Sequence, residues 1–172
     1  RGCAMRIGVV SDTHLNSRST ALPAALVRGL QGVDCILHAG DWIDESIVAL
    51  FESIAPVDGV AGNNDGEEII RRFGKRKVLA LGGFRIGLVH GDGGRSTPET
   101  AFQSFCDTHG HSTVDVVIFG HSHIPFLARR GGTLLFNPGS AADKRRQPQY
   151  SYGIIELTDR IEATHFYYAD RS

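Results

Sequence analysis

Five short segments of the sequence hold the kinds of side chain that bind metal ions in proteins. Each segment directly follows an apolar run, and together they offer carboxylates, an amide and imidazoles. In the last segment His121 and His123 flank one serine, and because side chains alternate in an extended chain, the two rings are expected to project the same way. The segments are SDTH (11–14), AGD (39–41), AGNND (61–65), LVHGD (88–92) and FGHSH (119–123).

This mixture of oxygen and nitrogen donors suits Mn²⁺, Fe²⁺ or Zn²⁺. No cysteine accompanies the donors, which argues against a structural zinc site. Seven donors are too many for one tetrahedral ion but fit two ions that share a bridging carboxylate. The candidate donors are Asp12, His14, Asp41, Asn63, His90, His121 and His123.

Taken singly, each segment also has an ordinary structural explanation. Residues 11–14 could cap a helix, 39–41 and 63–66 are common turn sequences, and an isolated His90 is more often hydrogen-bonded than bound to metal. The histidine pair in 121–123 is the most specific signal. Because all five segments stand at the ends of expected strands, a shared site is favoured over five unrelated turns.

The elements that position these segments alternate between strands and helices in the first half of the chain. Apolar runs predict strands at 6–10, 34–40 and 56–62, and amphipathic stretches predict helices at 19–30 and 45–54. This βαβαβ order predicts a largely parallel sheet, in which ligands collect beyond the carboxyl ends of the strands. Segments far apart in the sequence can therefore converge on one crevice.

The second half of the chain is expected to be mostly antiparallel strands. Gly82-Gly83 divides 77–91 into two strand runs and indicates a hairpin, and a helix is expected from about Thr97 with Pro98 at its first position. Two packed sheets with helices outside would satisfy both halves. The later strands are expected at 114–120, 125–130, 133–139, 150–159 and 160–168.

Composition limits the partners of the chain. The 172 residues include 18 Lys and Arg against 19 Asp and Glu, for a net charge of −1, which gives no general attraction to nucleic acid or anionic membranes. No apolar run approaches the roughly 18 residues of a membrane span. The three cysteines form no CxxC pair and Met5 leads directly into a strand without a signal peptide, so a reducing cytoplasm is expected. Residues 1–4 are expected to be a cloning remnant or ragged start, and 5–172 a single domain.

The motif set resembles that of the calcineurin-like metallophosphoesterase superfamily. DTH, GD, GNND, HG and GHSHIP occur in the family's order, and the short length and closing NPGS (137–140) are similar to its small bacterial and archaeal phosphodiesterase group. The resemblance extends from Met5 to about Tyr168. It implies an α/β fold, a four-layer αββα sandwich of two mixed β-sheets flanked by helices.

The resemblance also implies two divalent cations, with Mn²⁺ expected and Fe, Ni²⁺ or Zn²⁺ as alternatives. The implied reaction is hydrolysis of a small phosphodiester by in-line attack of a hydroxide that bridges the ions, without a phospho-enzyme intermediate. One ion would take Asp12, His14 and His123, the other Asn63, His90 and His121, and Asp41 would bridge them. The residues assigned to catalysis are Asp41, Asn63, Asn64 and His90.

Two positions depart from the family pattern. Phosphoprotein phosphatases of the superfamily carry a histidine directly after the metal-binding asparagine, where this chain has Asn64. An amide donates a hydrogen bond but cannot act as a general acid, so diesters and activated aryl esters are expected to react better than other monoesters. Asp92 stands where relatives frequently have a histidine, and it is expected to shape the loop.

Less specific roles are expected for the residues around these motifs. His38 is expected either to orient a ligand or to pack at a strand end, and Trp42 to pack in the core. The turn at 137–139 is expected to shape the rim of the site. The basic run 144–146 could grip extra phosphates, but a solvated loop is the preferred interpretation.

Two alternatives stand beside the phosphodiesterase. The same fold serves as a protein-interaction scaffold in the small phosphoesterase-like subunit of retromer, although all seven donor positions here hold competent residue types. A phosphomonoesterase, acting on nucleotides or proteins, is disfavoured by Asn64. The expected partner is a small phosphodiester rather than a membrane or nucleic acid in general, and relatives suggest a homodimer or homotetramer.

Overall fold

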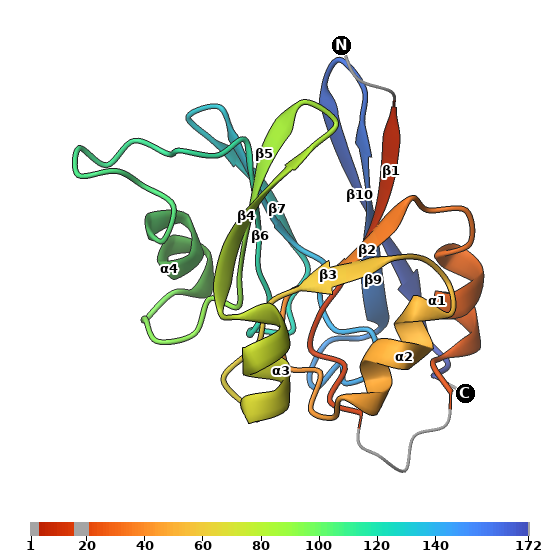
Figure 1. Ribbon diagram of the computed structural model, residues 1–172. Helices are drawn as coiled ribbons and strands as arrows, with labels where there is room; N and C mark the ends of the chain where they lie inside the picture. The colour runs from red at the N-terminus through yellow and green to blue at the C-terminus, as the bar shows by residue number, and fades with distance from the viewer. Residues whose placement is uncertain (1–3, 16–20, 172) are drawn as a thin grey trace.

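The computed structural model describes residues 4–15 and 21–171, which form two five-stranded sheets with helices at their sides (Figure 1). None of the described helices is long and apolar enough to cross a membrane. In chain order the elements are β1 (Met5–Val10), α1 (Ala24–Gly29), β2 (Cys35–His38), α2 (Ser46–Glu52), β3 (Val57–Gly59), α3 (Glu67–Phe73), β4 (Arg76–Leu81), β5 (Phe84–Val89), α4 (Thr97–Gln103), β6 (Val116–Ile118), β7 (Phe126–Arg130), β8 (Thr133–Asn137), β9 (Tyr150–Leu157) and β10 (Ile161–Tyr168).

Both sheets are mixed, with parallel strands at the centre. The first has the order β10-β9-β1-β2-β3, in which β1, β2 and β3 are parallel and β9 runs antiparallel to its neighbours. The second has the order β4-β5-β6-β8-β7. Its edge strands pair antiparallel, as expected for the second half of the chain, but its central strands β5, β6 and β8 are parallel. Each sheet therefore gathers several strand ends at one edge.

Three apolar clusters establish the order of the layers. Ile7 and Leu37 of the first sheet pack with Ile86, Ile118 and Phe136 of the second, so the two sheets lie face to face. A second cluster joins α1 and α2 to the outer face of the first sheet, and a third joins α4 to the outer face of the second. The predicted αββα sandwich is confirmed.

Local boundaries differ from the predicted ones. Helix α1 begins after Pro23 rather than at residue 19, and residues 19 and 20 lie outside the described residues. Helix α3 was not expected, because a seven-residue segment offers only a short periodic pattern. It begins after Gly66 and buries Ile69 and Phe73, one turn apart, beneath Trp42. The Trp42 ring stacks on that of Phe73 with centroids 4.7 Å apart, so this tryptophan packs in the core as expected.

Candidate metal centre

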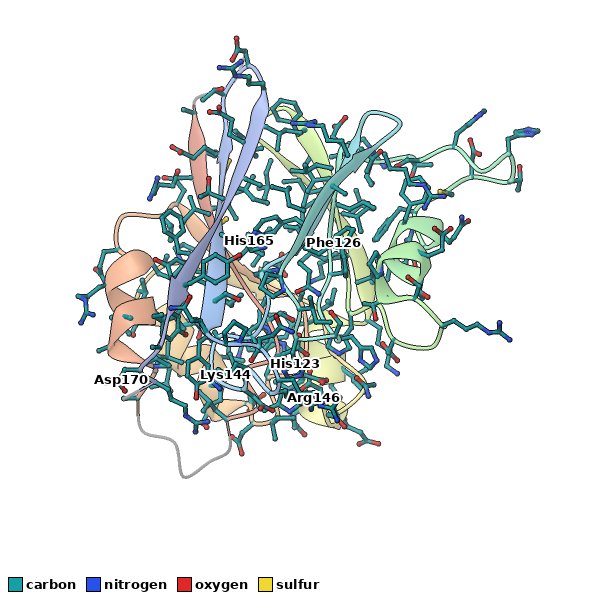
Figure 2. The ribbon with its side chains drawn as sticks, turned by 180° about the vertical axis from the view of Figure 1, so that it is seen from behind. His123, Phe126, Lys144, Arg146, His165 and Asp170 are labelled. Carbon is teal, nitrogen blue, oxygen red and sulfur yellow. The ribbon has the colours of Figure 1, made fainter. Side chains whose placement is uncertain are left out.

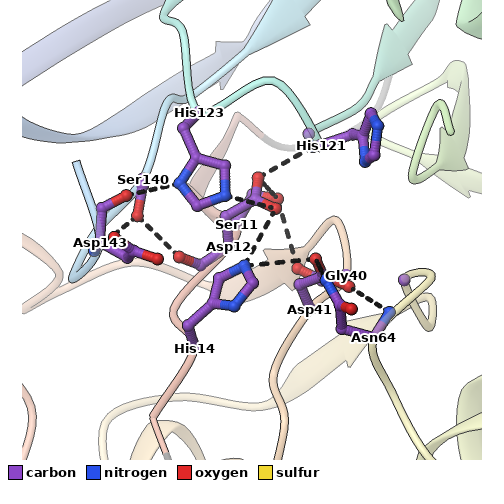
Figure 3. Close-up of polar contacts among 12 residues, drawn as sticks. Ser11, Asp12, His14, Gly40, Asp41, Asn64, His121, His123, Ser140 and Asp143 are labelled. Atoms are coloured by element: carbon purple, nitrogen blue, oxygen red, sulfur yellow. Dashed lines mark hydrogen bonds and ion pairs between the residues drawn. The ribbon is translucent and has the colours of Figure 1, made fainter. Parts of the chain in front are cut away.

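Backbone hydrogen bonds bring the segments that follow four strands to one edge of the sandwich. The Asp12 N–H donates to the Gly40 carbonyl at 2.9 Å, which joins the segments after β1 and β2. The Gly120 N–H donates to the His90 carbonyl at 3.0 Å, which joins the segments after β6 and β5. The two pairs meet where the His121 N–H donates to Asp12 Oδ2 at 2.9 Å. Segments from both sheets thus surround Asp12, as Figure 3 shows.

The backbone of these segments is left-handed at most of the predicted donors. Positive φ angles are uncommon outside glycine and are found where surrounding structure enforces them, often at functional sites. Among the described residues, two further non-glycine positions share this conformation, Ile43 and Arg145. The predicted donors with positive φ are Asp12 (51°), His14 (49°), Asp41 (61°), His121 (72°) and His123 (63°).

The expectation that 121–123 is extended is therefore wrong. Because the backbone turns at both histidines, His121 and His123 reach different neighbours. The His121 Nδ1 lies 3.2 Å from Asn63 Oδ1, and the His123 Nε2 lies 3.5 Å from Asp12 Oδ1. Gly120 permits the close approach of this loop to Ser11, because a Cβ atom at Gly120 would stand only 2.0 Å from Ser11 Oγ.

The first group of potential ligands consists of Asp12, His14 and His123, whose donor atoms lie within 4.8 Å of one another. Asp12 Oδ1 is 3.9 Å from the His14 Nε2 and 3.5 Å from the His123 Nε2. The two imidazole rings face each other with centroids 4.9 Å apart. These are the three residues that the family resemblance assigns to one ion.

The second group consists of Asp12, Asp41 and His90. Asp41 Oδ2 lies 3.4 Å from the His90 Nε2 and 3.3 Å from the His14 Nε2, and so contacts one residue of each expected set. His121 joins this side through its ring, 5.1 Å from that of His90. Five of the seven predicted donors thus form the two groups, and His121 and Asn63, which contact each other, lie at their edge.

Three buried polar atoms of this cluster have no hydrogen-bond partner, namely Asp12 Oδ1, His14 Nε2 and His90 Nε2. Leaving a buried polar atom unpaired is costly and rare, so three at one point indicate a missing partner. The His90 Nδ1 faces the Ala39 carbonyl at 2.8 Å, and the Asp12 Oδ2 accepts from the Ser11 hydroxyl at 2.8 Å. The opposite atoms, Asp12 Oδ1 and His90 Nε2, therefore aim into the cluster, where divalent cations would satisfy them.

Asp41 is held by two residues that follow Asn63. Asn64 donates its backbone N–H to Asp41 Oδ1 and its side-chain amide to Asp41 Oδ2, both at 2.9 Å. Asp65 is buried and accepts backbone N–H groups of Asp41, Gly62 and Ile43 at 2.7–2.8 Å. The sequence alone gave Asp65 no role. The signal that could have found it is an acidic residue directly after the GNN motif.

The NPGS segment braces the loops from the other side. Ser140 Oγ donates to the Asp12 carbonyl at 2.6 Å and accepts the Asp143 N–H at 2.7 Å. Asn137 donates from its amide to the Gly120 carbonyl at 3.0 Å and to Ser122 Oγ at 3.1 Å. The turn thus supports the histidine loop directly, beyond the rim-shaping role expected from sequence.

His38 and Asp92 are the two neighbours whose roles the sequence left open. His38 is fully buried and stacks on Trp42 with ring centroids 3.8 Å apart. Its Nδ1 accepts the Gly40 N–H at 3.0 Å, and its Nε2 contacts the Thr13 hydroxyl at 3.2 Å. His38 therefore both packs and fixes the two aspartate loops. Asp92 is exposed and belongs to neither group.

The two aspartates strongly bias protonation of the surrounding histidines. Burial alone lowers the pKa of His14 and of His90, but their close approach to the carboxylates of Asp12 and Asp41 outweighs it and raises each pKa to about 9. Burial raises the pKa of Asp41, but the nearby His14 and His90 rings and the Asn64 N–H outweigh it and leave that pKa far below its ordinary value. Without a metal, the two imidazoliums therefore balance the carboxylates near neutral pH.

Comparison with known proteins places this geometry in a family. The profile of the calcineurin-like phosphoesterase superfamily domain matches residues 5–160. The chain belongs to this superfamily. A protein of Methanothermobacter thermautotrophicus described as a probable metallophosphoesterase is 36% identical over 140 residues, covering 79% of this chain and 77% of that protein. A phosphodiesterase of Methanocaldococcus jannaschii is 26% identical over 147 residues, covering 78% of this chain and 83% of that protein.

A solved structure also shares this fold over nearly the whole of the chain. The Vps29 of Entamoeba histolytica, crystallised in complex with Zn²⁺, superposes with a TM-score of 0.71 at 23% identity, covering 95% of this chain and 99% of that one. At this level of identity the similarity establishes the fold.

Replacing Asp65 by asparagine (Asp65→Asn) is expected to lower the free energy of unfolding by about 1–3 kcal/mol, because an NH₂ group would replace one of two oxygens that accept backbone N–H groups. Urea denaturation of metal-free protein measures the change. The matched control is Asp44→Asn, whose exposed carboxylate accepts the Ser46 N–H outside the cluster, and it should change stability little. Equal losses in both variants would show that Asp65 does not hold the Asp41 loop.

Proposed function

We propose that this metallophosphoesterase is a phosphodiesterase that uses two divalent cations, with Mn²⁺ as the preferred ion. The observation that carries the proposal is the buried pair of carboxylates, Asp12 and Asp41, set among histidine nitrogens with three polar atoms lacking partners. Such atoms would be satisfied by cations at the two groups described above. Phosphodiester hydrolysis also agrees with the name of the Methanocaldococcus jannaschii relative.

The proposed ligand sets are those that the family resemblance implies, although Asp12 also lies 3.7 Å from the His90 Nε2 of the second set. The first set is Asp12, His14 and His123, the second is Asn63, His90 and His121, and Asp41 bridges them. Asp41 suits the bridging position because one of its oxygens already contacts a histidine of each set. Two cations, when bound, would activate a water molecule and neutralise charge on the phosphoryl oxygens.

The chain's own residues orient these ligands and leave one side open for substrate. Hydrogen bonds from His90 Nδ1 and His123 Nδ1 to backbone carbonyls direct each Nε2 inward. Asp12, Asp41 and His90 are buried, whereas Asn63 and Asn64 are exposed. We therefore place substrate entry on the Asn63–Asn64 side of the cluster.

Asn64 is the residue on which the preference for diesters rests. Both of its donors bind Asp41, so it acts first as a positioning residue for the proposed bridging carboxylate. An amide has no proton to give to a departing alkoxide, and a monoester of a poor leaving group would need one. The proposed substrates are consequently small phosphodiesters and activated aryl esters.

A scaffold role is the second candidate, since a Vps29 structure shares the fold. The intact donor set favours catalysis, because its buried histidines and carboxylates with unpaired atoms suit cations that would act on a substrate. A cytoplasmic location, in keeping with the free thiols of Cys35 and Cys106, and a homodimer or homotetramer belong to the same proposal.

Metal-stripped protein supplied with Mn²⁺ is expected to hydrolyse bis(p-nitrophenyl) phosphate with a higher kcat/KM than p-nitrophenyl phosphate. Asp41→Asn should lower kcat/KM by about 100-fold or more, since losing even the hydrogen-bond partner of a ligand costs roughly 10–100-fold. Asp92→Asn, an exposed change outside both groups, is the matched control and should retain activity. Release of p-nitrophenolate measures each rate.

The same assay separates the alternatives. Asn64→His should raise the monoester rate relative to the diester rate, because an imidazole can supply a proton. Faster turnover of phosphoserine than of the diester by the unaltered protein would identify a phosphomonoesterase. Failure to hydrolyse either ester with Mn²⁺, Ni²⁺ or Zn²⁺ would make the scaffold the leading function.

Metal uptake is expected to release protons. Below a pKa of about 9, His14 and His90 are protonated in the metal-free protein, but a histidine must be neutral to bind a metal. At about pH 7.5 binding should therefore release up to about two protons, and metal affinity should fall as the pH falls. Calorimetry with Zn²⁺ in buffers of different ionisation enthalpy counts these protons.

In Asp41→Asn the count should decrease, because the variant loses a carboxylate that raises both histidine pKa values. Affinity that is constant from about pH 6 to 9, with no proton release, would contradict metal binding by these two histidines.

A further inference from the structure

A cavity of about 270 Å³ adjoins the metal centre on the side of His123. It is lined by Ser122, His123 and Ile124 on one wall and by residues 144–147 on the other. Figure 2 shows Lys144 and Arg146 beside His123 at the same end of the molecule. The volume is smaller than that of typical small-molecule pockets, so the cavity suits part of a ligand whose remainder lies elsewhere.

The wall formed by residues 144–147 is basic and has a defined shape. The Gln147 N–H donates to the Lys144 carbonyl at 3.0 Å, which closes a turn whose second residue, Arg145, has a φ of 52°. Apart from the five predicted donors and Ile43, Arg145 is the one non-glycine residue in the described chain with this conformation. Arg145 and Arg146 are exposed, and although the Arg145 Nε lies 3.5 Å from Asp143 Oδ2, both guanidinium groups can meet a ligand.

The basic turn is tied to the metal centre by the residue before it. The Asp143 carbonyl faces the His123 Nδ1, and the Asp143 N–H donates to Ser140 Oγ. Ser140 Oγ in turn donates to the Asp12 carbonyl. The positions of Arg145 and Arg146 are therefore set relative to the side chains that would hold the cations, as they would not be in a free solvated loop.

The opposite end of the cluster carries the opposite charge. A cavity of about 360 Å³ beyond the Asp41 and Asn64 loops is lined by Asp44, Glu45, Glu67 and Glu68. Figure 3 shows His123 and Asp143 at one end of the cluster and Asn64 at the other. A substrate that spans the centre therefore meets positive charge on one side and negative charge on the other.

We propose that the basic cavity binds a second phosphate group carried on one ester arm of the substrate. The inference rests on the proposed phosphodiesterase function and names its substrate class, namely diesters with one phosphorylated arm and one arm without negative charge. Guanidinium groups suit this role because they bind phosphate through paired hydrogen bonds. The acidic cavity would repel a phosphate on the other arm, so the substrate has one favoured orientation.

Two chromogenic diesters test this inference with the Mn²⁺-loaded protein. One is the p-nitrophenyl ester of thymidine 5′-monophosphate, and the other is the same ester with a phosphate on the 3′-oxygen. The unaltered protein should have a KM about three- to tenfold lower for the phosphorylated ester, and the difference should shrink with added salt.

The test variant is Arg145→Asn/Arg146→Gln, since asparagine tolerates the left-handed backbone of position 145. It should raise KM for the phosphorylated ester about three- to tenfold more than for the plain ester. The matched control, Arg28→Gln/Arg160→Gln, removes the same charge from exposed positions on α1 and the β9–β10 turn and should change neither KM. Equal KM values for the two esters, or a preference that survives in the test variant, would overturn the inference.

If neither ester is hydrolysed, the proposed function fails and binding decides the inference separately. Calorimetry should then show tighter binding of thymidine 3′,5′-bisphosphate than of thymidine 5′-monophosphate, and the test variant should lose this difference. No difference in the unaltered protein would refute the basic cavity as a phosphate site.

Discussion

Two buried carboxylates, those of Asp12 and Asp41, lie close together, and the surrounding loops hold them in place. Asp12 and Asp41 are almost fully inaccessible to water, and each lies within 4 Å of histidine nitrogens. Two like charges in such a place repel each other and lose their hydration, so they need compensating positive charge. Protonated His14 and His90 can supply it near neutral pH, and divalent cations would supply it more strongly.

The loops that carry the two aspartates have a strained backbone. Left-handed backbone at Asp12 and Asp41 is unfavourable, and it persists because both ends of each loop are fixed. The β1 and β2 strands are anchored in the apolar layer between the sheets, while Asp65 and Ser140 bind the backbone from the far side. A rigid sandwich therefore stabilises a geometry that an isolated loop would abandon.

Sequence patterns predicted the features that follow from a regular spacing of apolar residues, namely the strands and their ends. Runs of apolar residues predicted the strands, and strand ends predicted where the donors meet, which the His121–Asn63 and Asp41–His90 contacts bear out. The seven donors as metal ligands remain a prediction. The left-handed turns at His121 and His123 were missed, because nothing in the local sequence after this apolar strand signals a positive φ.

Supporting contacts were harder to predict than the donors. Asp65 and Ser140 act through backbone groups of distant segments, and such partners depend on how the loops pack rather than on a motif. The basic turn at 144–146 illustrates the same limit. Its sequence left open a solvated loop or a segment overhanging the site, and the link from Asp143 to His123 sets its exposed arginines beside the cluster.

Anomalous diffraction from crystals grown with Mn²⁺ tests most directly whether these residues hold two cations. The arrangement predicts two peaks per chain, one beside His14 and His123 and one beside Asn63 and His121, with Asp41 in contact with both. A single peak, or two peaks of which Asp41 touches only one, would contradict the proposed dinuclear centre.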